Sequence, residues 1–365
     1  MKFDYLIVGA GFFGSVFARE MSNLGKKCFV IDKRTHIGGN AYSYKKEGID
    51  IHKYGPHIFH TNEKKIWDYV NNFDNFVPYF NRGKVKYKNR IFSFPINLMT
   101  FNQLWGVKTP EEAKRMIESK KKQISNPKNL EDFVLSQVGE EIYEIFIRGY
   151  TRKQWGREPK DLPISIIKRI PIRFSFNEFS VDDKYQGVPE NGYDRLFENL
   201  LDGITYEVGI DYFSNREYYN NLAHKIIYTG CIDQFFDYKF GNLEYRGLRF
   251  ENEIREMEDF QGNALMNYTE EDIPYTRICE HKHFLPFIKT KKTIITKEFP
   301  IEWKNGLEPY YPINNEINNQ KFNLYLEESK KQKNVIFGGR LGKYKYYDMH
   351  QVVANALKMA KMENK

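Results

Sequence analysis

The sequence predicts an α/β fold in which a discontinuous parallel-sheet domain is interrupted by a helical bundle and an antiparallel β-sheet. Three patterns predict it: a strand, glycine turn, helix and strand open the chain, a strand, glycine pair and helix close it, and helical and then β-rich segments lie between. Of the 365 residues, 41% are hydrophobic and 28% are charged, as in globular proteins of two or three domains. Aromatic residues reach 16%, which favours a ligand with flat rings.

The first forty residues have the pattern of a Rossmann dinucleotide-binding unit. The apolar run 3–8 predicts a buried parallel strand, and the turn Gly9-Ala10-Gly11-Phe12-Phe13-Gly14 follows it directly. A second apolar run, 28–31, ends at Asp32. Between the turn and this run, one helix face is apolar, formed by Phe13, Val16, Phe17, Met21 and Leu24.

Each part of this pattern has a physical task in binding a dinucleotide. Gly9 permits a tight turn, Gly11 lets the backbone approach a pyrophosphate, and Gly14 lets the helix pack closely on the strand. The first helical turn offers unpaired N–H groups to the phosphate, and Asp32 can accept hydrogen bonds from a ribose diol. A glycine turn that serves only packing is the alternative, and the strand, helix and acid at the expected spacing argue against it.

Residues further along favour FAD over NAD as the dinucleotide. Asp32 is followed by Lys33 and then by Gly38, Gly39 and Asn40, which resembles the FAD-binding signature of glutathione-reductase-like flavoproteins. Near the other end, residues 334–337 predict a strand, and a glycine turn and an acid before a helical pattern follow it. In that superfamily such a segment returns to hold the flavin. We therefore expect a discontinuous FAD-binding domain of residues 1–80, 188–244 and 316–365.

The middle of the chain predicts helices first and strands later. Apolar spacing predicts helices over 109–122 and 130–150, within a bundle of residues 96–158. We expect an antiparallel substrate sheet from residues 81–95, 159–187 and 245–315. Its predicted strands, rich in β-branched residues and bounded by turns, are 170–176, 247–251, 264–268 and 293–299.

Histidines, aromatic residues and arginines in this middle part are candidate site residues. His57 and His60 follow a glycine–proline turn without a third metal ligand at useful spacing, so we expect no metal and a histidine beside the flavin. Phe146 and Tyr150 share a helix face, where they could hold a flat base or simply pack. Arginine suits a diphosphate because its planar fork donates two parallel hydrogen bonds, although a surface salt bridge is the alternative for each candidate: Arg169, Arg173 and Arg277.

Charge and cysteine content limit the partners and the compartment. Lys and Arg number 56 against 48 Asp and Glu, a formal charge of +8 that fits an anionic small ligand, a membrane surface or nucleic acid. The longest basic runs are only two or three residues, and no nucleic-acid motif accompanies them. Three scattered cysteines and the lack of a long apolar run predict reduced thiols and a cytoplasmic protein without a membrane span.

Several longer motifs resemble those of the bacterial UDP-galactopyranose mutases over nearly the whole chain. Two of them lie early, His36-Ile37-Gly38-Gly39-Asn40-Ala41-Tyr42 and Tyr54-Gly55-Pro56-His57-Ile58-Phe59-His60-Thr61. The most specific ones follow in order: Tyr150-Thr151-Arg152-Lys153-Gln154-Trp155, Lys168-Arg169-Ile170-Pro171, Pro274-Tyr275-Thr276-Arg277, Pro309-Tyr310-Tyr311-Pro312 and Tyr344-Lys345-Tyr346-Tyr347-Asp348-Met349.

The resemblance implies an isomerase that interconverts UDP-galactopyranose and UDP-galactofuranose with no net redox change. Reduced FAD is implied as cofactor, with its N5 attacking the anomeric carbon to give a covalent sugar adduct. This would explain why the sequence offers no Ser-His-Asp set and no paired acid and base. The family also implies a cytoplasmic homodimer that feeds galactofuranose into cell-surface glycans.

The resemblance also assigns roles to individual residues. Arg169, Arg277 and His57 would be catalytic, the arginines by neutralising the diphosphate and the histidine by setting the flavin's reactivity. The cofactor would be held by Gly9, Gly11, Phe13, Gly14, Asp32, Lys33, Gly38, Gly39, Asn40, His57, Ile58, Gly339, Arg340, Asp348 and Met349. The substrate would be held by Asn81, Phe146, Tyr150, Thr151, Trp155, Arg169, Asn267, Arg277, Tyr311 and Tyr346.

One departure from the family leaves the choice of sugar open. Many relatives carry an Asn-Tyr-Phe segment whose tyrosine reaches the substrate, whereas this chain has Glu178-Phe179-Ser180. The preference between galactose and its N-acetyl derivative is therefore not predicted. Two other hypotheses stay open, a flavin oxidoreductase acting on an amine and a catalytically silent protein that binds nucleotide sugars.

Overall fold

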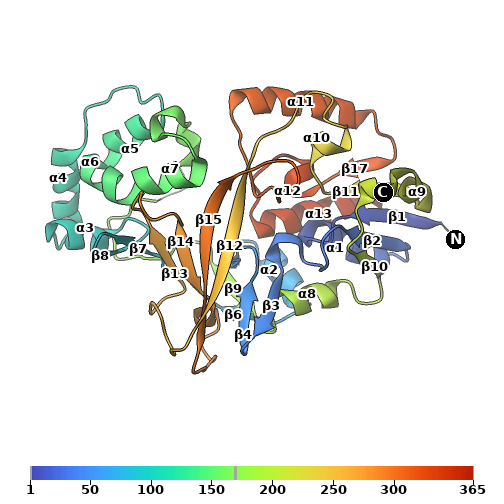
Figure 1. Cartoon of the computed structure of the whole chain (residues 1–365), viewed down its shortest axis with the longest axis horizontal. Helices are drawn as coiled ribbons and strands as arrows, with labels where there is room; N and C mark the ends of the chain where they lie inside the picture. Colours follow the sequence, from blue (N-terminus) through green and yellow to red (C-terminus); the bar gives the residue numbers. More distant parts are fainter. Residues whose placement is uncertain (1, 168–170, 365) are drawn as a thin grey trace.

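The computed structural model describes residues 2–167 and 171–364, and it confirms the predicted α/β class. A five-stranded parallel sheet with the order β10-β2-β1-β11-β17 forms one half of the molecule (Figure 1). Its strands come from three distant parts of the chain: β1 (Phe3–Val8), β2 (Cys28–Asp32), β10 (Thr205–Val208), β11 (Ala223–Tyr228) and β17 (Val335–Phe337). This sheet is discontinuous in sequence, as the two glycine-containing ends of the chain predict.

Helices cover both faces of the parallel sheet. Successive residues of β1 point to opposite faces, so they belong to two different hydrophobic cores. Tyr5 and Ile7 belong to the core beneath α1 (Phe12–Asn23) and α13 (Met349–Glu363), whereas Leu6 belongs to the core on the other face. Parallel strands buried on both faces are expected to be almost wholly apolar. The other helices of this half are α8 (Tyr193–Leu200), α9 (Arg216–Leu222), α10 (Ile232–Phe235), α11 (Glu316–Lys330) and α12 (Gly339–Gly342).

A seven-stranded sheet with the order β16-β12-β15-β14-β13-β7-β8 lies between the parallel sheet and the helical bundle (Figure 1). All its pairs are antiparallel except β13 with β7, where Met266 is opposite Lys84 in a parallel register. The expected antiparallel sheet is therefore mixed at that pair. Its strands are β7 (Lys84–Tyr87), β8 (Arg90–Ser93), β12 (Tyr245–Arg255), β13 (Leu265–Tyr268), β14 (Arg277–Glu280), β15 (Thr293–Glu302) and β16 (Tyr311–Pro312).

Smaller elements connect these layers. Two small sheets pair β3 (Ser43–Lys46) with β4 (Ile49–His52), and β9 (Tyr185–Pro189) with β5 (Phe59–Thr61) and β6 (Phe76–Pro78). The short helix α2 (Lys64–Asn71) follows β5. Single 3-10 turns occur at Gly39–Ala41, Pro159–Asp161, Ile164–Ile166, Tyr212–Asn215 and His281–Phe284.

The helical bundle differs in detail from the predicted helix 130–150. That segment is broken at Gly139, which has a φ of 80° and where a Cβ would lie 2.4 Å from the carbonyl oxygen of Lys120. A residue with a side chain would not permit this close approach, so glycine ends one helix and begins the next. The bundle contains α3 (Leu98–Trp105), α4 (Pro110–Lys120), α5 (Leu130–Val138), α6 (Glu140–Ile142), a π-helix (Tyr143–Arg148) and α7 (Gly149–Trp155).

The strand predicted over 170–176 is wrong for the part that the structure describes. Residues 171–176 are irregular, and they attach to the bundle through Arg173 N–H, which donates to the carbonyl oxygen of Ile96 at 2.9 Å. Ser175 in turn accepts from the N–H of Leu98 at 2.9 Å. Ile172 is the β-branched residue within this part, and no described strand pairs with residues 171–176. Within residues 2–167 and 171–364, no helix is both long and apolar enough to cross a membrane.

Candidate active site and cofactor cavity

A cavity of about 1010 Å³ joins the two halves of the molecule. It begins at the carboxyl ends of β1, β2 and β11, where a doubly wound sheet usually binds its ligand, and extends to Arg277 on β14 and Tyr311 on β16. Every residue predicted to hold the cofactor lines this cavity: Gly9, Gly11, Phe13, Gly14, Asp32, Lys33, Gly38, Gly39, Asn40, His57, Ile58, Gly339, Arg340, Asp348 and Met349.

Glycines shape the cavity floor where the chain turns from β1 into α1. Gly9 has a φ of 110°, and a Cβ there would lie 2.0 Å from Thr229 Oγ1. A Cβ at Gly39 would lie 3.0 Å from the Cα of Gly11, so the two glycine segments are in close contact. Among the described residues, no side chain caps the N-terminus of α1, and its first turn contains no acidic residue. This arrangement suits a pyrophosphate, which backbone N–H groups and the helix dipole attract.

Asp32 lies at the end of β2 and holds the glycine turn in place. Its carboxylate accepts the N–H of Ala10 at 2.8 Å and the N–H of Arg34 at 2.9 Å, and only 8% of the residue is exposed. A carboxylate oxygen can accept more than one hydrogen bond, so a ribose hydroxyl can still donate to Asp32 from the cavity.

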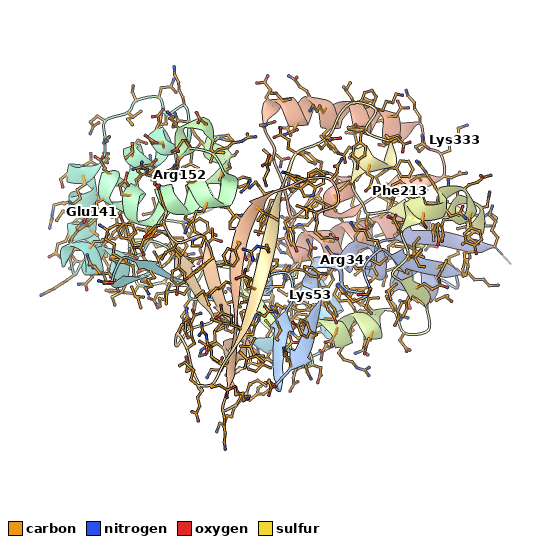
Figure 2. The ribbon with its side chains drawn as sticks, viewed as in Figure 1. Arg34, Lys53, Glu141, Arg152, Phe213 and Lys333 are labelled. Atoms are coloured by element: carbon orange, nitrogen blue, oxygen red, sulfur yellow. The ribbon has the colours of Figure 1, made fainter. Side chains whose placement is uncertain are left out.

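A charged and aromatic cluster forms the wall beside Asp32. Glu308 accepts from Arg34 at 2.7 Å and pairs with Lys33 at 3.3 Å. The Arg34 guanidinium lies 4.4 Å from the centre of the Tyr54 ring, and Lys53 Nζ lies 5.4 Å from the same ring (Figure 2). The cations near the predicted nucleotide therefore already have partners, which holds the wall rigid.

The donor set and the shape of this cavity fit FAD. The uncapped helix and the close glycines suit a pyrophosphate, and Asp32 suits a ribose. The cavity continues past His57 and Met349 toward the second sheet, which leaves room for a ring system as well as a nucleotide. The buried Nε of Arg340 has no hydrogen-bond partner in the described part of the chain, which provides a donor for an anionic or carbonyl group.

His57 is held in one tautomer on the cavity wall. Its Nδ1 lies 2.8 Å from the carbonyl oxygen of Gly55, so Nδ1 carries the proton and Nε2 is an acceptor. Burial, reinforced by nearby His52, lowers the pKa of His57 to about 3. The imidazole is therefore neutral at physiological pH and can accept a hydrogen bond at Nε2.

Two buried histidines fix the turn that carries His57. The backbone N–H of His57 donates to His52 Nδ1 at 3.0 Å, and the backbone N–H of His52 donates to His281 Nδ1 at 3.3 Å. His281 Nε2 lies 2.6 Å from Thr296 Oγ1, which donates to Asn252 Oδ1 at 2.7 Å. Since His281 Nδ1 is an acceptor, its Nε2 must be the donor to Thr296. This chain of hydrogen bonds joins the cofactor side of the cavity to the second sheet.

Arg277 forms the opposite end of the cavity with an acid beside it. Arg277 and Glu298 are cross-strand neighbours on β14 and β15, and Arg277 Nε donates to Glu298 Oε2 at 2.7 Å. Burial opposes the charge of Arg277, but Glu298 more than offsets it and raises the pKa of the guanidinium further. Arg277 is therefore permanently charged, and its terminal nitrogens have no hydrogen-bond partner among the described residues.

Tyrosines surround this arginine. Tyr311 and Tyr346 stack with ring centres 5.4 Å apart, and the Arg340 guanidinium lies 4.4 Å from the centre of the Tyr346 ring. Burial raises the pKa of Tyr311 well above its ordinary value and that of Tyr150 to about 12, so both phenols keep their protons. Two guanidinium groups and neutral phenols can together bind a diphosphate by donating hydrogen bonds.

The other predicted substrate residues that the structure describes lie outside the lining of this cavity. Phe146 is 3% exposed and packs against Phe92 in the core of the bundle, with ring centres 5.4 Å apart. Asn81 donates to Ser180 Oγ at 2.7 Å, and Asn267 donates to the carbonyl oxygen of Lys84 at 3.0 Å. Tyr150, Thr151 and Trp155 are on α7 or at its end, and the structure does not describe Arg169.

The segment that departs from the family motif is attached to the second sheet. Glu178 accepts from Lys84 at 3.0 Å and from Ser93 Oγ at 2.5 Å. Phe179 packs against Phe80 with ring centres 5.2 Å apart. Ser180 Oγ accepts a hydrogen bond from Asn81, which holds this residue beside Asn81.

Sequence reasoning missed Glu298, Arg34 and His52. Glu298 follows Lys297 in the predicted strand 293–299, and its pairing with Arg277 follows only from the strand register. Arg34 stands two residues after Asp32 and directly after Lys33, so the sequence itself shows a second cation that could contribute to the nucleotide site. Nothing in the sequence marks His52 as the partner of His57.

Comparisons with known proteins agree with this geometry. A family model described as UDP-galactopyranose mutase matches residues 145–346, and one described as an NAD(P)-binding Rossmann-like domain matches residues 7–73. The chain is 40% identical to dTDP-fucopyranose mutase from Escherichia coli, over 98% of this chain and 97% of that one. It is 41% identical to a probable UDP-galactopyranose mutase from Klebsiella pneumoniae, over 98% and 94%. The crystal structure of a reduced UDP-galactopyranose mutase has the same fold, with a TM-score of 0.76 over 99% of this chain and 93% of that one, at 13% identity.

Proposed function

This chain belongs to the UDP-galactopyranose mutase family and is an isomerase, and from that premise we propose that it interconverts UDP-galactopyranose and UDP-galactofuranose with reduced FAD. The observation that carries the proposal is the position of Arg277. Glu298 holds this guanidinium at the end of the same cavity whose other end has the glycine turn and Asp32. A diphosphate bound at Arg277 would place its sugar toward the middle of the cavity, between the nucleotide-binding ends.

FAD fits the cofactor end for the reasons given above, and Arg340 and Met349 would complete its site. When bound and reduced, the flavin would supply its nitrogen N5 as the nucleophile. All other contacts with the substrate would come from the chain's own side chains.

Those groups would bind and orient the substrate and stabilise its leaving group. Arg277 donates to the diphosphate through its terminal nitrogens, and the neutral phenols of Tyr311 and Tyr346 donate without adding charge. His57 accepts a hydrogen bond at Nε2 and remains unprotonated because burial lowers its pKa to about 3. The diphosphate and the sugar are thus oriented by groups that are already in place before binding.

A second substrate is favoured by one finding. The relative named dTDP-fucopyranose mutase covers almost the whole chain at 40% identity, which is as similar as the relative named for galactose. The two substrates share a diphosphate and a pyranose ring, and they differ in the base, in the 2′-hydroxyl of the nucleoside and in one hydroxyl group of the transferred sugar. Arg277 and the tyrosines would bind the diphosphate of either one, so the reaction class would be the same.

The test is to separate pyranose from furanose forms chromatographically after incubating the purified protein with UDP-galactopyranose, with and without dithionite. We expect conversion only when dithionite is present. Parallel runs with dTDP-fucopyranose and with UDP-N-acetylgalactosamine would decide the sugar. Lack of conversion of all three, with flavin verified as bound and reduced, would exclude the proposal, and net flavin reduction by an amine would favour the oxidoreductase hypothesis. A cytoplasmic homodimer that supplies galactofuranose to cell-surface glycans remains the accompanying expectation.

A further inference from the structure

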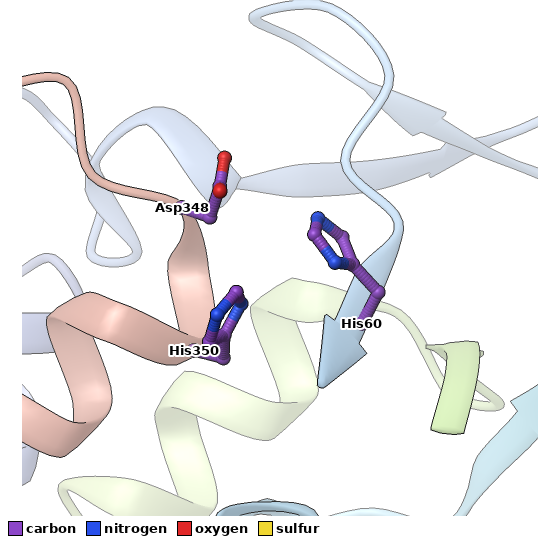
Figure 3. A group of neighbouring side chains, drawn as sticks. All are labelled: His60, Asp348 and His350. Atoms are coloured by element: carbon purple, nitrogen blue, oxygen red, sulfur yellow. The ribbon is translucent and has the colours of Figure 1, made fainter. Parts of the chain in front are cut away.

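Three potential metal ligands converge at the edge of the cofactor cavity. His60 comes from β5, whereas Asp348 and His350 come from the start of α13, almost 300 residues further along the chain. Each side chain offers a ligand atom, and these atoms all lie within 4.8 Å of one another. Figure 3 shows the three side chains around one space, with His60 facing the first turn of α13. All three are half-buried, and His60 and Asp348 line the cavity, so a small ion can reach them.

The hydrogen bonds around the two imidazoles allow both of them to coordinate a metal ion. His60 Nδ1 lies 2.5 Å from Asp183 Oδ2, so Nδ1 carries the proton and leaves Nε2 as a lone-pair donor. A histidine whose other nitrogen donates to a carboxylate is the usual arrangement at metal sites, because the carboxylate fixes the tautomer and raises the basicity of the ligand. His350 Nδ1 is buried and has no hydrogen-bond partner within the part of the chain that is described.

The charges around the three ligands favour a cation. Asp348, Asp183 and Glu63 are the carboxylates that act electrostatically on His350. The N-terminus of α13 contributes roughly half a positive charge, which the carboxylates outweigh. No lysine or arginine is among the main charges that act on His350.

A second cluster of three potential ligands, with one histidine and two carboxylates, differs in these respects. Asp259, Glu280 and His283 also lie within reach of one another, but Lys282 Nζ pairs with Asp259 at 3.2 Å. Glu280 already accepts the N–H of Phe260 at 2.9 Å and the hydroxyl of Thr293 at 2.7 Å, and His283 pairs with both acids. Lys282 therefore supplies a cation to that cluster, whereas among the described residues no lysine or arginine forms an ion pair with His60, Asp348 or His350.

We propose that His60, Asp348 and His350 form a binding site for a divalent transition-metal ion of the zinc class. Two imidazoles and one carboxylate are a typical set of three protein ligands for zinc, with a fourth position open to water. The ligand atoms of a tetrahedral zinc stand roughly 3.3 Å apart, so small side-chain rotations would close the present separation. The bound ion would join β5 to α13 at the wall of the cofactor cavity. The sequence alone offered no third ligand for His60, because the fold brings the other two from the far end of the chain.

Zinc binding can be measured without turnover, and it is therefore independent of the proposed mutase activity. The flavin-loaded protein, freed of metal with EDTA, would be titrated with zinc chloride in a calorimeter. We expect one ion per chain with a Kd of about 1 μM or tighter. His60→Gln and His350→Gln should each weaken binding by about 100-fold or more, and Asp183→Asn by about 10- to 100-fold. His283→Gln is the matched control and should bind zinc like the unmodified chain.

Crystals of the unmodified protein soaked in zinc provide a second measurement that does not depend on any variant folding. An anomalous peak at the zinc edge, bounded by His60, Asp348 and His350, is expected. Zinc located elsewhere, zinc binding that His60→Gln and His350→Gln leave unchanged, or the absence of binding at 100 times the expected Kd would overturn the proposal. Equal loss in His283→Gln would show that the other cluster is the site.

Discussion

Arg277 is suited to a leaving diphosphate because one edge of its guanidinium is already fixed. Glu298, which is its cross-strand neighbour, accepts a hydrogen bond from Arg277 Nε at 2.7 Å, and the arginine side chain is 22% exposed, toward the cavity. The rest of the planar fork can therefore meet the ligand without first being ordered. Pre-ordered donors are effective in stabilising charge that develops in a transition state, because they need no reorganisation at that moment.

This arrangement predicts that Arg277→Lys lowers kcat with reduced flavin by about 100-fold, because an ammonium is a point charge and cannot donate in parallel or keep the Glu298 contact. Turnover of the galactose substrate under dithionite is the measurement. The control is Arg249→Lys, which should retain activity. Arg249 is an exposed arginine on β12, the strand on the other side of β15 from β14, and its guanidinium lies 4.1 Å from the Phe299 ring centre. Unchanged kcat in Arg277→Lys would remove the residue from the catalytic role.

The contact between α1 and β1 is the tightest feature of the cofactor end. At Gly14 a Cβ would lie 2.0 Å from the carbonyl oxygen of Gly9 and 2.8 Å from Ile7 Cγ2. A backbone oxygen cannot move aside cheaply, so Gly14→Ala should push α1 away from the strand, at a cost of roughly 1–3 kcal/mol in unfolding free energy and with weaker retention of flavin. Urea denaturation and the flavin absorbance of the purified protein measure both effects.

The matched control for this prediction is Gly83→Ala. A Cβ at Gly83 would meet its nearest atom, the carbonyl oxygen of Phe94, at 3.6 Å, which is ordinary contact, and we expect little change. If Gly14→Ala were as stable as Gly83→Ala and kept its flavin, close packing would not be the task of Gly14.

Half-buried Lys153 of helix α7 binds the segment that precedes Arg277. Lys153 Nζ donates to the carbonyl oxygens of Tyr268, Ile273 and Tyr275 at 2.8, 2.9 and 3.0 Å. We expect Lys153→Met to lower the unfolding free energy by about 2 kcal/mol and to reduce turnover, because Tyr275 is two residues from Arg277. Lys160→Met, at an exposed position after the same helix, is the control. Equal stability of the two variants would contradict this role.

The two halves of the site differed in how far the sequence could predict them. The glycine fingerprint, Asp32 and the C-terminal Gly339-Arg340 segment depend on local chain geometry, so their spacing was sufficient to predict that they meet at one cavity. The partner of Arg277 depends on strand register, and the break in the predicted helix 130–150 depends on the contact of Gly139 with Lys120. The grouping of His60 with Asp348 and His350 depends on the whole fold. Patterns along the chain carry no information on such long-range contacts.

Buried histidines should make the stability of the whole molecule depend on mildly acidic pH. Burial lowers the pKa of His36, His57, His281 and His350 in the folded chain, and it is only for His283 that Glu280 raises it. A histidine whose pKa is lowered in the folded chain takes up its proton more readily when the chain is unfolded. Its contribution to the unfolding free energy is therefore complete above about pH 6.5 and is lost as the pH falls below that value. His283 acts in the opposite direction, because its contribution to the unfolding free energy increases as the pH falls. It therefore offsets the contribution of one of the other four histidines.

The unfolding free energy should therefore fall by about 2 kcal/mol or more between pH 7.5 and pH 5.5, at up to about 1.4 kcal/mol per pH unit for each uncompensated histidine. Urea denaturation across this range is the measurement, and the window stays above the region where most carboxylates titrate. His281 is 2% exposed, so His281→Gln should flatten the slope even if it lowers stability at every pH. His224→Gln, at an exposed position, should leave the slope unchanged. Stability that stays constant or rises on acidification would show that these imidazoles are charged in the folded protein, and the neutral, hydrogen-bond-accepting His57 would then have to be abandoned.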